Sequence, residues 1–350
     1  MDSAISGAMS DAIDREWIPG GVTLVWHDGA LLHRAAHGFS QISPNREKAN
    51  VETVYDLASL TKPVVTATIA MSLIARGQLA LEDPVSRHIG EYVGDGRDDV
   101  TINHLLLHTS GLSAFGADQA KKVVDRQSAK DILCSSRNLA RPPGELFEYT
   151  DLGPILLGFV IETITGEPLE RAAKRIIFGP LGMSDTRFCP KDLSRIAPTE
   201  EMNGVMLRGT AHDPICRAMG GVAGHAGLFG TADDLLKYAM MILAGGNLNG
   251  AELLPRAAVA RMVRPEPVPG GGSRALGWDV DTVYSSPRGD LLKSQGIGHS
   301  GYTGTSIWID FESKLVIILL TNRVHPHVRE GIVQLRRRLA NVVAANLELA

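Results

Sequence analysis

Strand-like and helix-like hydrophobic patterns occupy different parts of the 350-residue chain. Two β-rich runs lie between residues 20 and 40, and the Asp28-Gly29 pair between them is a strong hairpin signal. Strand patterns return after residue 206, in the segments GVMLRG, LGWDVDTVY, TSIWIDF and KLVIILLTN. We therefore expect an antiparallel pair near the N-terminus and most of the other strands near the C-terminus.

Helical periodicity dominates the middle of the chain. From about Ala58 to Arg76 apolar residues recur at the spacing of a buried helix face, and Gly77 supplies a stop signal. Prolines interrupt the pattern between residues 80 and 205. Shorter helices are expected near 101–108, 127–137, 152–165, 168–177, 231–244, 255–263 and 328–347.

These patterns predict an α/β protein of the α+β sandwich type. The sheet domain is expected to combine residues 1–78 with residues 206–350, because strands occur at both ends of the chain. Residues 79–205 are expected to form an inserted, mostly helical subdomain. A chain of this length is long enough for such a two-part organisation.

Composition excludes several classes of protein. Lys and Arg total 35 against 39 Asp and Glu, so no basic excess favours nucleic acid as a partner. The apolar runs are far shorter than the roughly 20 residues that span a bilayer, so no membrane partner is expected. The acidic N-terminal segment lacks an apolar signal region, which predicts a cytoplasmic location. The three cysteines are too scattered to predict disulfides: Cys134, Cys189 and Cys216.

Ser59 and Lys62 lie three residues apart at the start of the long predicted helix. This spacing places both side chains on one helix face. A lysine amine can activate a serine hydroxyl as a nucleophile, and a helix N-terminus favours a developing anion. The alternative is a capping serine followed by a solvated lysine, since S-x-x-K alone is a common pattern.

Two further segments strengthen the catalytic interpretation. Tyr149 and Asp151 follow a Pro-Gly turn, and the segment from His299 to Thr305 precedes a strong strand pattern. The order S-x-x-K, then Y-x-N, then K/H-x-G resembles the serine β-lactamase and penicillin-recognising superfamily. Segments around residues 55–58, 101–112 and 220–228 resemble its class C-like branch, which includes family VIII carboxylesterase-like and D-aminopeptidase-like hydrolases.

The resemblance implies a β-lactamase/transpeptidase-like fold, with an antiparallel sheet flanked by helices and an inserted all-α subdomain. It also implies a role for each matching residue. Ser59 would be the acylated nucleophile, Lys62 its partner, and Tyr149 the general base or proton relay. The segment His299-Ser300-Gly301 would form an edge strand, and the backbone N–H groups of Ser59 and Tyr302 would form the oxyanion hole. Ser300, Gly301 and Tyr302 would thus contact the substrate.

Two residues depart from the pattern of the lactamases. Asp151 replaces the usual asparagine, and its charge favours a protonated Lys62, which shifts the base role toward Tyr149. Asp151 either contacts the substrate or serves only as an ion-pair partner of Lys62. His299 replaces the usual lysine, which weakens a fixed cationic contact to a β-lactam carboxylate.

Other groups of chemically active residues offer alternatives to this interpretation. His104 and His108 have the i, i+4 spacing of a zinc pair that His212, Asp213 or His225 would complete, but no H-E-x-x-H motif is present. We therefore expect no metal and no cofactor. His225 either lines the cleft or packs beside it. The run Arg336–Arg338 on the last predicted helix is expected to be a solvated face.

The sequence thus predicts a serine hydrolase that cleaves a small-molecule ester or amide through an acyl-Ser59 intermediate, most simply as a carboxylesterase. β-Lactamase, D-amino-acid amidase or peptidase, and acyl transfer remain open. A protein of another class, a catalytically silent ligand sensor or self-assembling scaffold, is the remaining alternative. The oligomeric state cannot be derived from these patterns.

Overall fold

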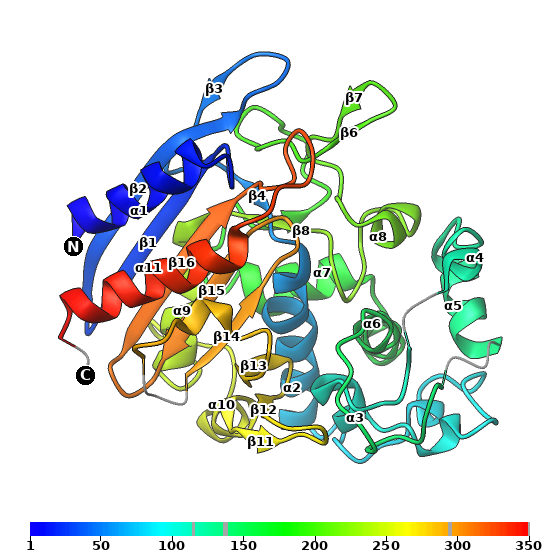
Figure 1. Cartoon of the computed structure of the whole chain (residues 1–350). Coiled ribbons are helices and arrows are strands. Elements are labelled where there is room, and N and C mark those ends of the chain that lie inside the picture. Colours follow the sequence, from blue (N-terminus) through cyan, green and yellow to red (C-terminus); the bar gives the residue numbers. More distant parts are fainter. Residues whose placement is uncertain (114–115, 136–138, 293–295, 349–350) are drawn as a thin grey trace.

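A nine-stranded antiparallel sheet organises the computed structural model, which describes residues 1–350 except 114–115, 136–138, 293–295 and 349–350 (Figure 1). The strand order is β11-β12-β13-β14-β15-β16-β1-β2-β3. Their bounds are β1 Gly20–His27, β2 Ala30–Gln41, β3 Glu47–Lys48, β11 Glu266–Pro267, β12 Ser273–Ala275, β13 Trp278–Asp281, β14 Ile297–Ser300, β15 Ser306–Asp310 and β16 Leu315–Thr321. The sheet therefore contains strands from both ends of the sequence.

The contact between β1 and β16 joins these two ends. Gly21 pairs with Thr321 and the antiparallel register continues to His27 opposite Leu315. The hairpin expected between β1 and β2 is confirmed, and Asp28 and Gly29 both have positive φ, at 40° and 92°. This is the backbone geometry that tight hairpin turns require. The domain boundaries at 78/79 and 205/206 stay a prediction.

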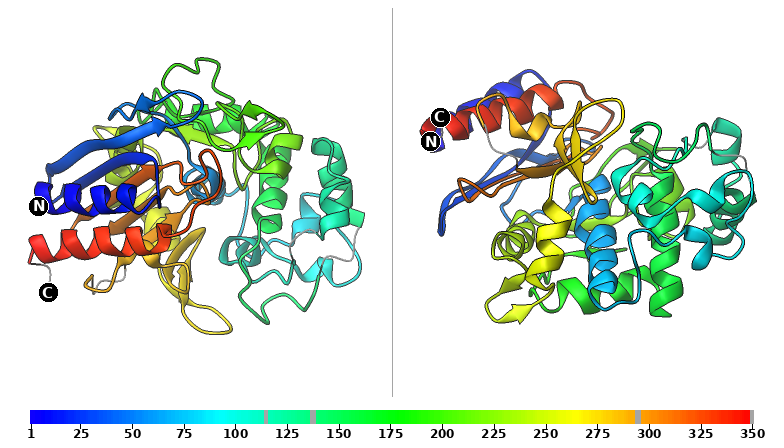
Figure 2. Two further views of the ribbon diagram at one scale, coloured as in Figure 1. Left: turned by 45° about the horizontal axis from the view of Figure 1, so that its top comes forward. Right: turned by 90° about the horizontal axis from the view of Figure 1, so that it is seen from below.

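Helices cover both faces of the sheet (Figure 2). On one face lie α1 (Asp2–Asp14) and α11 (Ile332–Asn346), whose buried apolar side chains pack on β15 and β16. On the other face lie α2 (Thr68–Ala75), α9 (Ala232–Leu243) and α10 (Arg256–Val263), within the larger hydrophobic core. The expected α/β sandwich is confirmed. Helix α1 was not predicted, because its apolar face is narrow: Ile5, Met9 and Ala12.

The long central helix is confirmed but is irregular. A 3₁₀ turn (η1, Ala58–Leu60) is followed by a π-helical segment (η2, Lys62–Ala67) and then by α2. Pro63 lies in this stretch and has no N–H to donate, so a regular hydrogen-bond ladder is interrupted there. Residues Ala58–Ala75 are long and apolar enough to cross a membrane, yet 83% of them are buried inside the fold.

Most of the remaining helices lie beside the large sheet (Figure 1), and η6 (Ser286–Arg288) packs against α11. They are η3 Val85–Arg87, η4 Arg97–Asp99, α3 Ile102–Leu107, α4 Ala117–Ala120, α5 Arg126–Ser135, α6 Leu152–Thr165, α7 Leu169–Ala173, η5 Lys174–Phe178, α8 Pro214–Ala218 and η6 Ser286–Arg288. The helices expected from 101 to 177 are thus confirmed within a few residues. Residues 136–138, at the end of one of them, lie outside the described residues.

Short strands complete the fold. They are β4 Tyr55–Asp56, β5 Arg187–Phe188, β6 Glu201–Met202, β7 Val205–Met206, β8 Leu228–Gly230, β9 Asn247–Leu248 and β10 Ala251–Glu252. The strand expected at 204–209 is wrong as a sheet strand, because β7 pairs only with β6 across a turn with positive φ at Asn203 and Gly204. The small sheet β4-β8-β5 is more important for the site, because β4 leads directly into Ser59.

Candidate active site

A strained turn presents Ser59 at the start of the central helical segment. Ala58 has a φ of +47°, which is costly for a residue with a Cβ atom. The buried Asp56 side chain holds this turn, since its Oδ1 accepts from Ala58 N–H at 2.8 Å and its Oδ2 accepts from His212 N–H at 2.7 Å. Thr61 Oγ1 also donates to Ala58 O at 2.7 Å. These hydrogen bonds fix the position from which Ser59 faces the cavity.

The Lys62 amine connects Ser59 to Asp151. Lys62 Nζ donates to Ser59 Oγ at 2.8 Å and to His225 O at 3.1 Å, and it lies 2.7 Å from Asp151 Oδ1. Burial opposes the charged amine, but the negative charge of Asp151 and the nearby Tyr149 oxygen together raise the pKa of Lys62 above its ordinary value. Lys62 is therefore protonated, which agrees with the expectation from Asp151.

Tyr149 lies against the same amine, within a group of aromatic rings. Lys62 Nζ is 5.1 Å from the centroid of the Tyr149 ring. His108 stacks on Tyr149 with centroids 4.6 Å apart, and Tyr284 lies 5.0 Å away. Burial, followed by the charge of Arg274, holds the pKa of His108 well below its ordinary value. A neutral His108 and Tyr284 thus fix the orientation of the Tyr149 ring.

His299 reaches the site from β14. Its ring centroid lies 6.0 Å from that of Tyr149, and its Nδ1 is 3.0 Å from Ser300 O. Because a carbonyl oxygen can only accept, Nδ1 carries the proton and Nε2 is left as an acceptor. Burial, then the charges of Lys62 and Arg274, keeps the pKa of His299 well below its ordinary value. His299 is therefore neutral and supplies no cationic contact.

The expectation that His299-Ser300-Gly301 would be an edge strand is wrong. Strands β13, β12 and β11 continue the sheet beyond β14. The pairing of β13 with β14 is confined to Asp279 opposite Gly298, so β13 diverges before Ser300. The end of β14 therefore still opens onto the cavity even though the strand lies inside the sheet order.

The loop after β14 is built around a close backbone approach at Gly301. A Cβ atom there would lie 2.2 Å from Thr305 Oγ1 and 2.7 Å from Leu57 O, so no larger residue fits without movement. Thr303 Oγ1 donates to Asp56 O at 2.8 Å and Thr305 Oγ1 donates to Leu57 O at 3.1 Å. The loop is thus bonded directly to the turn that carries Ser59.

Two arginines hold the outer side of this loop. Arg336 Nη2 donates to Gly301 O and Thr305 O, both at 2.8 Å, and Arg323 Nε donates to Tyr302 O at 2.8 Å. Within the described part of the chain, the N–H groups of Ser59 and Tyr302 have no hydrogen-bond partner. Both N–H groups are therefore available as hydrogen-bond donors.

Arg336 corrects the interpretation of the basic run on α11. Arg336 is 6% exposed, whereas Arg337 and Arg338 have half-exposed side chains. The residue lies on the apolar stripe of α11, with Leu335 and Leu339. Burial lowers the pKa of Arg336 to about 9. Its place on that stripe is the signal that could have identified it from the sequence.

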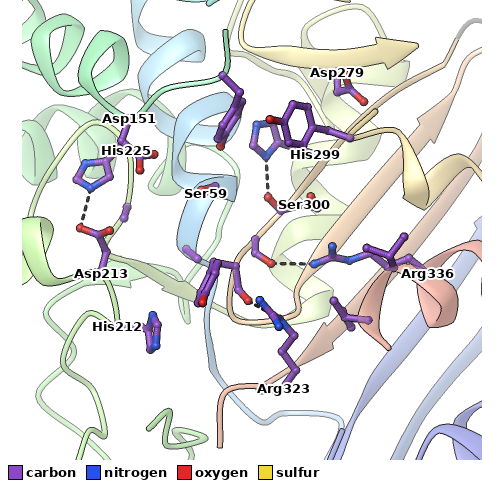
Figure 3. A pocket seen from close by; sticks show the side chains of 18 of the residues that line it. Ser59, Asp151, His212, Asp213, His225, Asp279, His299, Ser300, Arg323 and Arg336 are labelled. Carbon is purple, nitrogen blue, oxygen red and sulfur yellow. Dashed lines mark hydrogen bonds and ion pairs between the residues drawn. The ribbon is translucent and has the colours of Figure 1, made fainter. Parts of the chain in front are cut away.

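These groups line one cavity of about 600 Å³ (Figure 3). Of the residues predicted from the sequence, the lining includes Ser59, Tyr149, Asp151, His299, Ser300, Gly301 and Tyr302, and Lys62 lies buried behind Ser59. Several other lining residues were not predicted from the sequence: Glu200, Arg274, Asp279, Tyr284, Arg323, Val328, Ile332, Val333 and Arg336.

His225 lines the cavity, and its side chain is buried in the cavity wall. Its Nε2 lies 2.8 Å from Asp213 Oδ1. Asp213 also caps α8, because the same oxygen accepts from Cys216 N–H at 2.7 Å. Burial opposes the charged carboxylate, but His225 and these hydrogen bonds keep the pKa of Asp213 well below its ordinary value. Asp213 is therefore a fixed negative charge in the cavity wall.

Within the described ranges, His104 and His108 do not belong to a wider cluster of ligand side chains. His104 Nδ1 accepts from Thr101 N–H at 3.2 Å within the cap of α3, and His108 Nδ1 accepts from Thr150 N–H at 3.3 Å. Among the described residues, the three side chains whose ligand atoms all lie within 4.8 Å of one another are Asp151, Asp213 and His225.

Comparisons with known proteins agree with this geometry. The family model described as Beta-lactamase matches residues 3–341. A Salmonella typhi protein, provisionally named D-alanyl-D-alanine carboxypeptidase, is 32% identical over 343 residues, covering 87% of this chain and 79% of its own. An octameric penicillin-binding protein homologue from Pyrococcus abyssi superposes with a TM-score of 0.81 at 23% identity, covering 99% and 78% of the two chains. The structure described as EstCE1, a hydrolase with promiscuous acyltransferase activity, superposes with a TM-score of 0.80 at 24% identity, covering 97% of each chain.

The fold and the serine-centred cavity define a serine hydrolase of the β-lactamase/transpeptidase type. The chain belongs to the beta-lactamase family.

Proposed function

We propose that this protein hydrolyses a small ester or amide through an acyl-Ser59 intermediate. The contact that supports the proposal most directly is the Lys62 amine, which bridges Ser59 and Asp151 at the floor of the cavity. A buried, charged lysine with both partners in place preorganises the nucleophile before substrate binds.

In the acylation step, Ser59 Oγ forms a bond to the substrate carbonyl carbon. Lys62 is already protonated and donates to Ser59 Oγ, so it cannot take the hydroxyl proton. Tyr149 relays that proton: its phenol oxygen accepts it while the proton of the phenol passes to the leaving alcohol or amine as the old C–O or C–N bond breaks. The N–H groups of Ser59 and Tyr302 stabilise the negative charge on the carbonyl oxygen.

Deacylation follows the same path with water. Tyr149 accepts a proton from water as the water oxygen bonds to the acyl carbon, and the proton of the phenol passes to Ser59 Oγ as the ester bond breaks. The products are free enzyme and a carboxylic acid, so atoms and charges balance over the cycle. An alcohol in place of water would give acyl transfer by the same route.

The neutral His299 favours carboxylesterase-type chemistry over β-lactam hydrolysis. A β-lactam carries a carboxylate, and the position where the lactamases use a lysine carries no charge in this protein. The apolar side chains of Val328, Ile332 and Val333 line another part of the cavity and suit an uncharged substrate group. The name of the Salmonella relative makes D-alanyl peptide bonds a second candidate. The cytoplasmic location expected from the sequence stays a prediction.

The test is covalent labelling with a fluorophosphonate, read by intact-protein mass and peptide mapping. We expect one adduct on Ser59 in the wild type and in Ser3→Ala, an exposed control, and none in Ser59→Ala. Tyr149→Phe should lower kcat/KM on short p-nitrophenyl esters by about 10²–10⁴-fold, the usual contribution of a general base. A wild-type protein without an adduct on Ser59 would contradict the proposal and favour a silent sensor or scaffold.

A further inference from the structure

The cavity has walls of opposite charge on the two sides of Ser59. In Figure 3, Asp151 and Asp213 lie on one side of Ser59, and Arg323 and Arg336 lie on the other. We call the first side the acidic wall and define it by Asp151, Asp213 and His225. Its ligand atoms all lie within 4.8 Å of one another.

The acidic wall is open to the cavity at its carboxylates. The Asp151 side chain is 47% exposed and the Asp213 side chain is 27% exposed, whereas Lys62 is 2% exposed behind them. Burial favours the neutral acid, but the charge of Lys62 and its hydrogen bond lower the pKa of Asp151, and the hydrogen bonds from His225 and Cys216 N–H lower the pKa of Asp213, so both carboxylates are ionised. Lys62 supplies one positive charge against two negative charges.

His225 does not supply a second positive charge to balance the two carboxylates, because a protonated ring would lack one hydrogen-bond partner. Its Nε2 donates to Asp213, but its Nδ1 is buried and has no hydrogen-bond partner among the described residues. A protonated ring would bury an N–H without a hydrogen-bond partner at that atom, which is unfavourable. A neutral ring leaves an unpaired acceptor nitrogen there, which costs less free energy. The acidic wall therefore keeps one unmatched negative charge beside the nucleophile.

A divalent metal ion fits this wall poorly. Lys62 Nζ already lies 2.7 Å from Asp151 Oδ1, so a metal ion on Asp151 would lie next to a fixed ammonium. Asp213 Oδ1 already accepts two hydrogen bonds, from Cys216 N–H and from His225. A singly charged group that donates hydrogen bonds matches the charge and can use the remaining lone pairs of the carboxylates.

We propose that the acidic wall binds a protonated amino group on the acyl part of the substrate. Lys62 Nζ contacts both Ser59 and Asp151, so a single amine group separates the Asp151 carboxylate from the nucleophile. The α-amino nitrogen of an aminoacyl group is two bonds from the carbon that Ser59 attacks, and thus comes within reach of Asp151. The substrate class is then an aminoacyl ester or amide with a free amino group. This inference rests on the proposed acyl-serine function.

The experiment compares two phosphonylating probes that differ only in the amino group. Diphenyl 1-aminoethylphosphonate, as each enantiomer, and diphenyl ethylphosphonate both modify an active serine with loss of phenol. Labelling rates of Ser59 are read by intact mass in the wild type, Asp151→Asn, Asp213→Asn and the control Asp281→Asn. Asp281 lies on β13, where it pairs with Arg288 and is absent from the cavity lining.

We expect one enantiomer of the amino probe to label wild type at least about tenfold faster than the ethyl probe, the effect of one charge-assisted hydrogen bond. The ratio should approach one in Asp151→Asn, fall in Asp213→Asn and stay at the wild-type value in Asp281→Asn. Using the ratio cancels any general effect of Asp151 on Lys62.

A wild-type ratio near or below one for both enantiomers, with Ser59 labelled, would overturn the amino-group inference and leave the acyl-serine function standing. A high ratio that survives in both Asp151→Asn and Asp213→Asn would also overturn it. Failure of every probe, and of fluorophosphonate, to modify Ser59 would overturn both the function and the inference.

Discussion

Lys62 Nζ and Asp151 Oδ1 lie 2.7 Å apart, and the same amine donates to the Ser59 hydroxyl at 2.8 Å. The carboxylate therefore controls the charge of the group that touches the nucleophile. A lysine in this environment acts as a hydrogen-bond donor and a fixed charge, while proton transfer falls to Tyr149.

Asp151→Asn removes the negative charge that keeps Lys62 protonated. Burial lowers the pKa of Lys62, and the Asp151 charge is the largest effect opposing it. Without that charge the pKa of Lys62 falls, so the amine loses its proton at a lower pH. The alkaline limb of kcat/KM on a short ester without an amino group should therefore move to lower pH. A limb that stays in place or moves to higher pH would show that Lys62 is not held charged by Asp151.

Arg336 is predicted to position the loop after β14, which carries the Tyr302 N–H group. Arg336→Met removes the donor to Gly301 O and Thr305 O, so Tyr302 N–H shifts from its place. We expect kcat to fall, by up to the roughly 10²–10³-fold decrease that follows removal of one oxyanion-hole donor, with little change in KM. The neighbouring exposed Arg337→Met is the matched control and should retain wild-type kinetics. Equal losses in both variants, or a loss confined to KM, would rule out this role.

Gly301→Ala tests the close approach between the loop and the Ser59 turn. The added Cβ would lie 2.2 Å from Thr305 Oγ1 and 2.7 Å from Leu57 O. We expect a loss of about 1–3 kcal/mol in free energy of unfolding, as for other overpacked sites, together with a lower kcat. Gly7→Ala on α1, where nothing lies within 4 Å of the added Cβ, should fold at least as stably as wild type. A Gly301→Ala protein with full activity would contradict the assigned loop geometry.

His108 is predicted to make stability fall with acidity. Its folded pKa lies well below the ordinary imidazole value of about 6.5, so the unfolded chain binds more protons between those two values. The free energy of unfolding therefore decreases as pH falls from 7 toward the folded pKa. His108→Gln removes this contribution and should flatten the slope by up to about 1.4 kcal/mol per pH unit.

Urea denaturation at pH 5, 6 and 7 measures that slope, with the exposed His327→Gln as control. A His108→Gln slope as steep as that of wild type would show that burial of His108 does not disfavour its charged form.

The outline of the fold and the core of the site could be predicted from local patterns. Asp28-Gly29 specifies its hairpin through backbone conformation, and S-x-x-K specifies which two side chains share a helix face. Helix α1 was missed because only three of its side chains are buried, which is a weak periodic signal. The hairpin β6-β7 was taken for a sheet strand because short apolar segments carry no information about their partner strand.

The groups that complete the site could not be found in this way. Arg323 and Arg336 reach the loop after β14 from the C-terminal part of the chain, and Arg274 lines the cavity from β12. Their sequence neighbours say nothing of the cavity they share, because tertiary packing alone brings them together. The same holds for Asp213, because the fold and not its position in the sequence brings it close to Asp151.

The most direct measurement of the central claim is a rapid-quench experiment with a short p-nitrophenyl ester, followed by intact mass and peptide mapping. We expect a burst of p-nitrophenol matched by an acyl adduct on Ser59, with no adduct in Ser59→Ala. Turnover without any acyl adduct on wild-type Ser59, or turnover retained in Ser59→Ala, would contradict it.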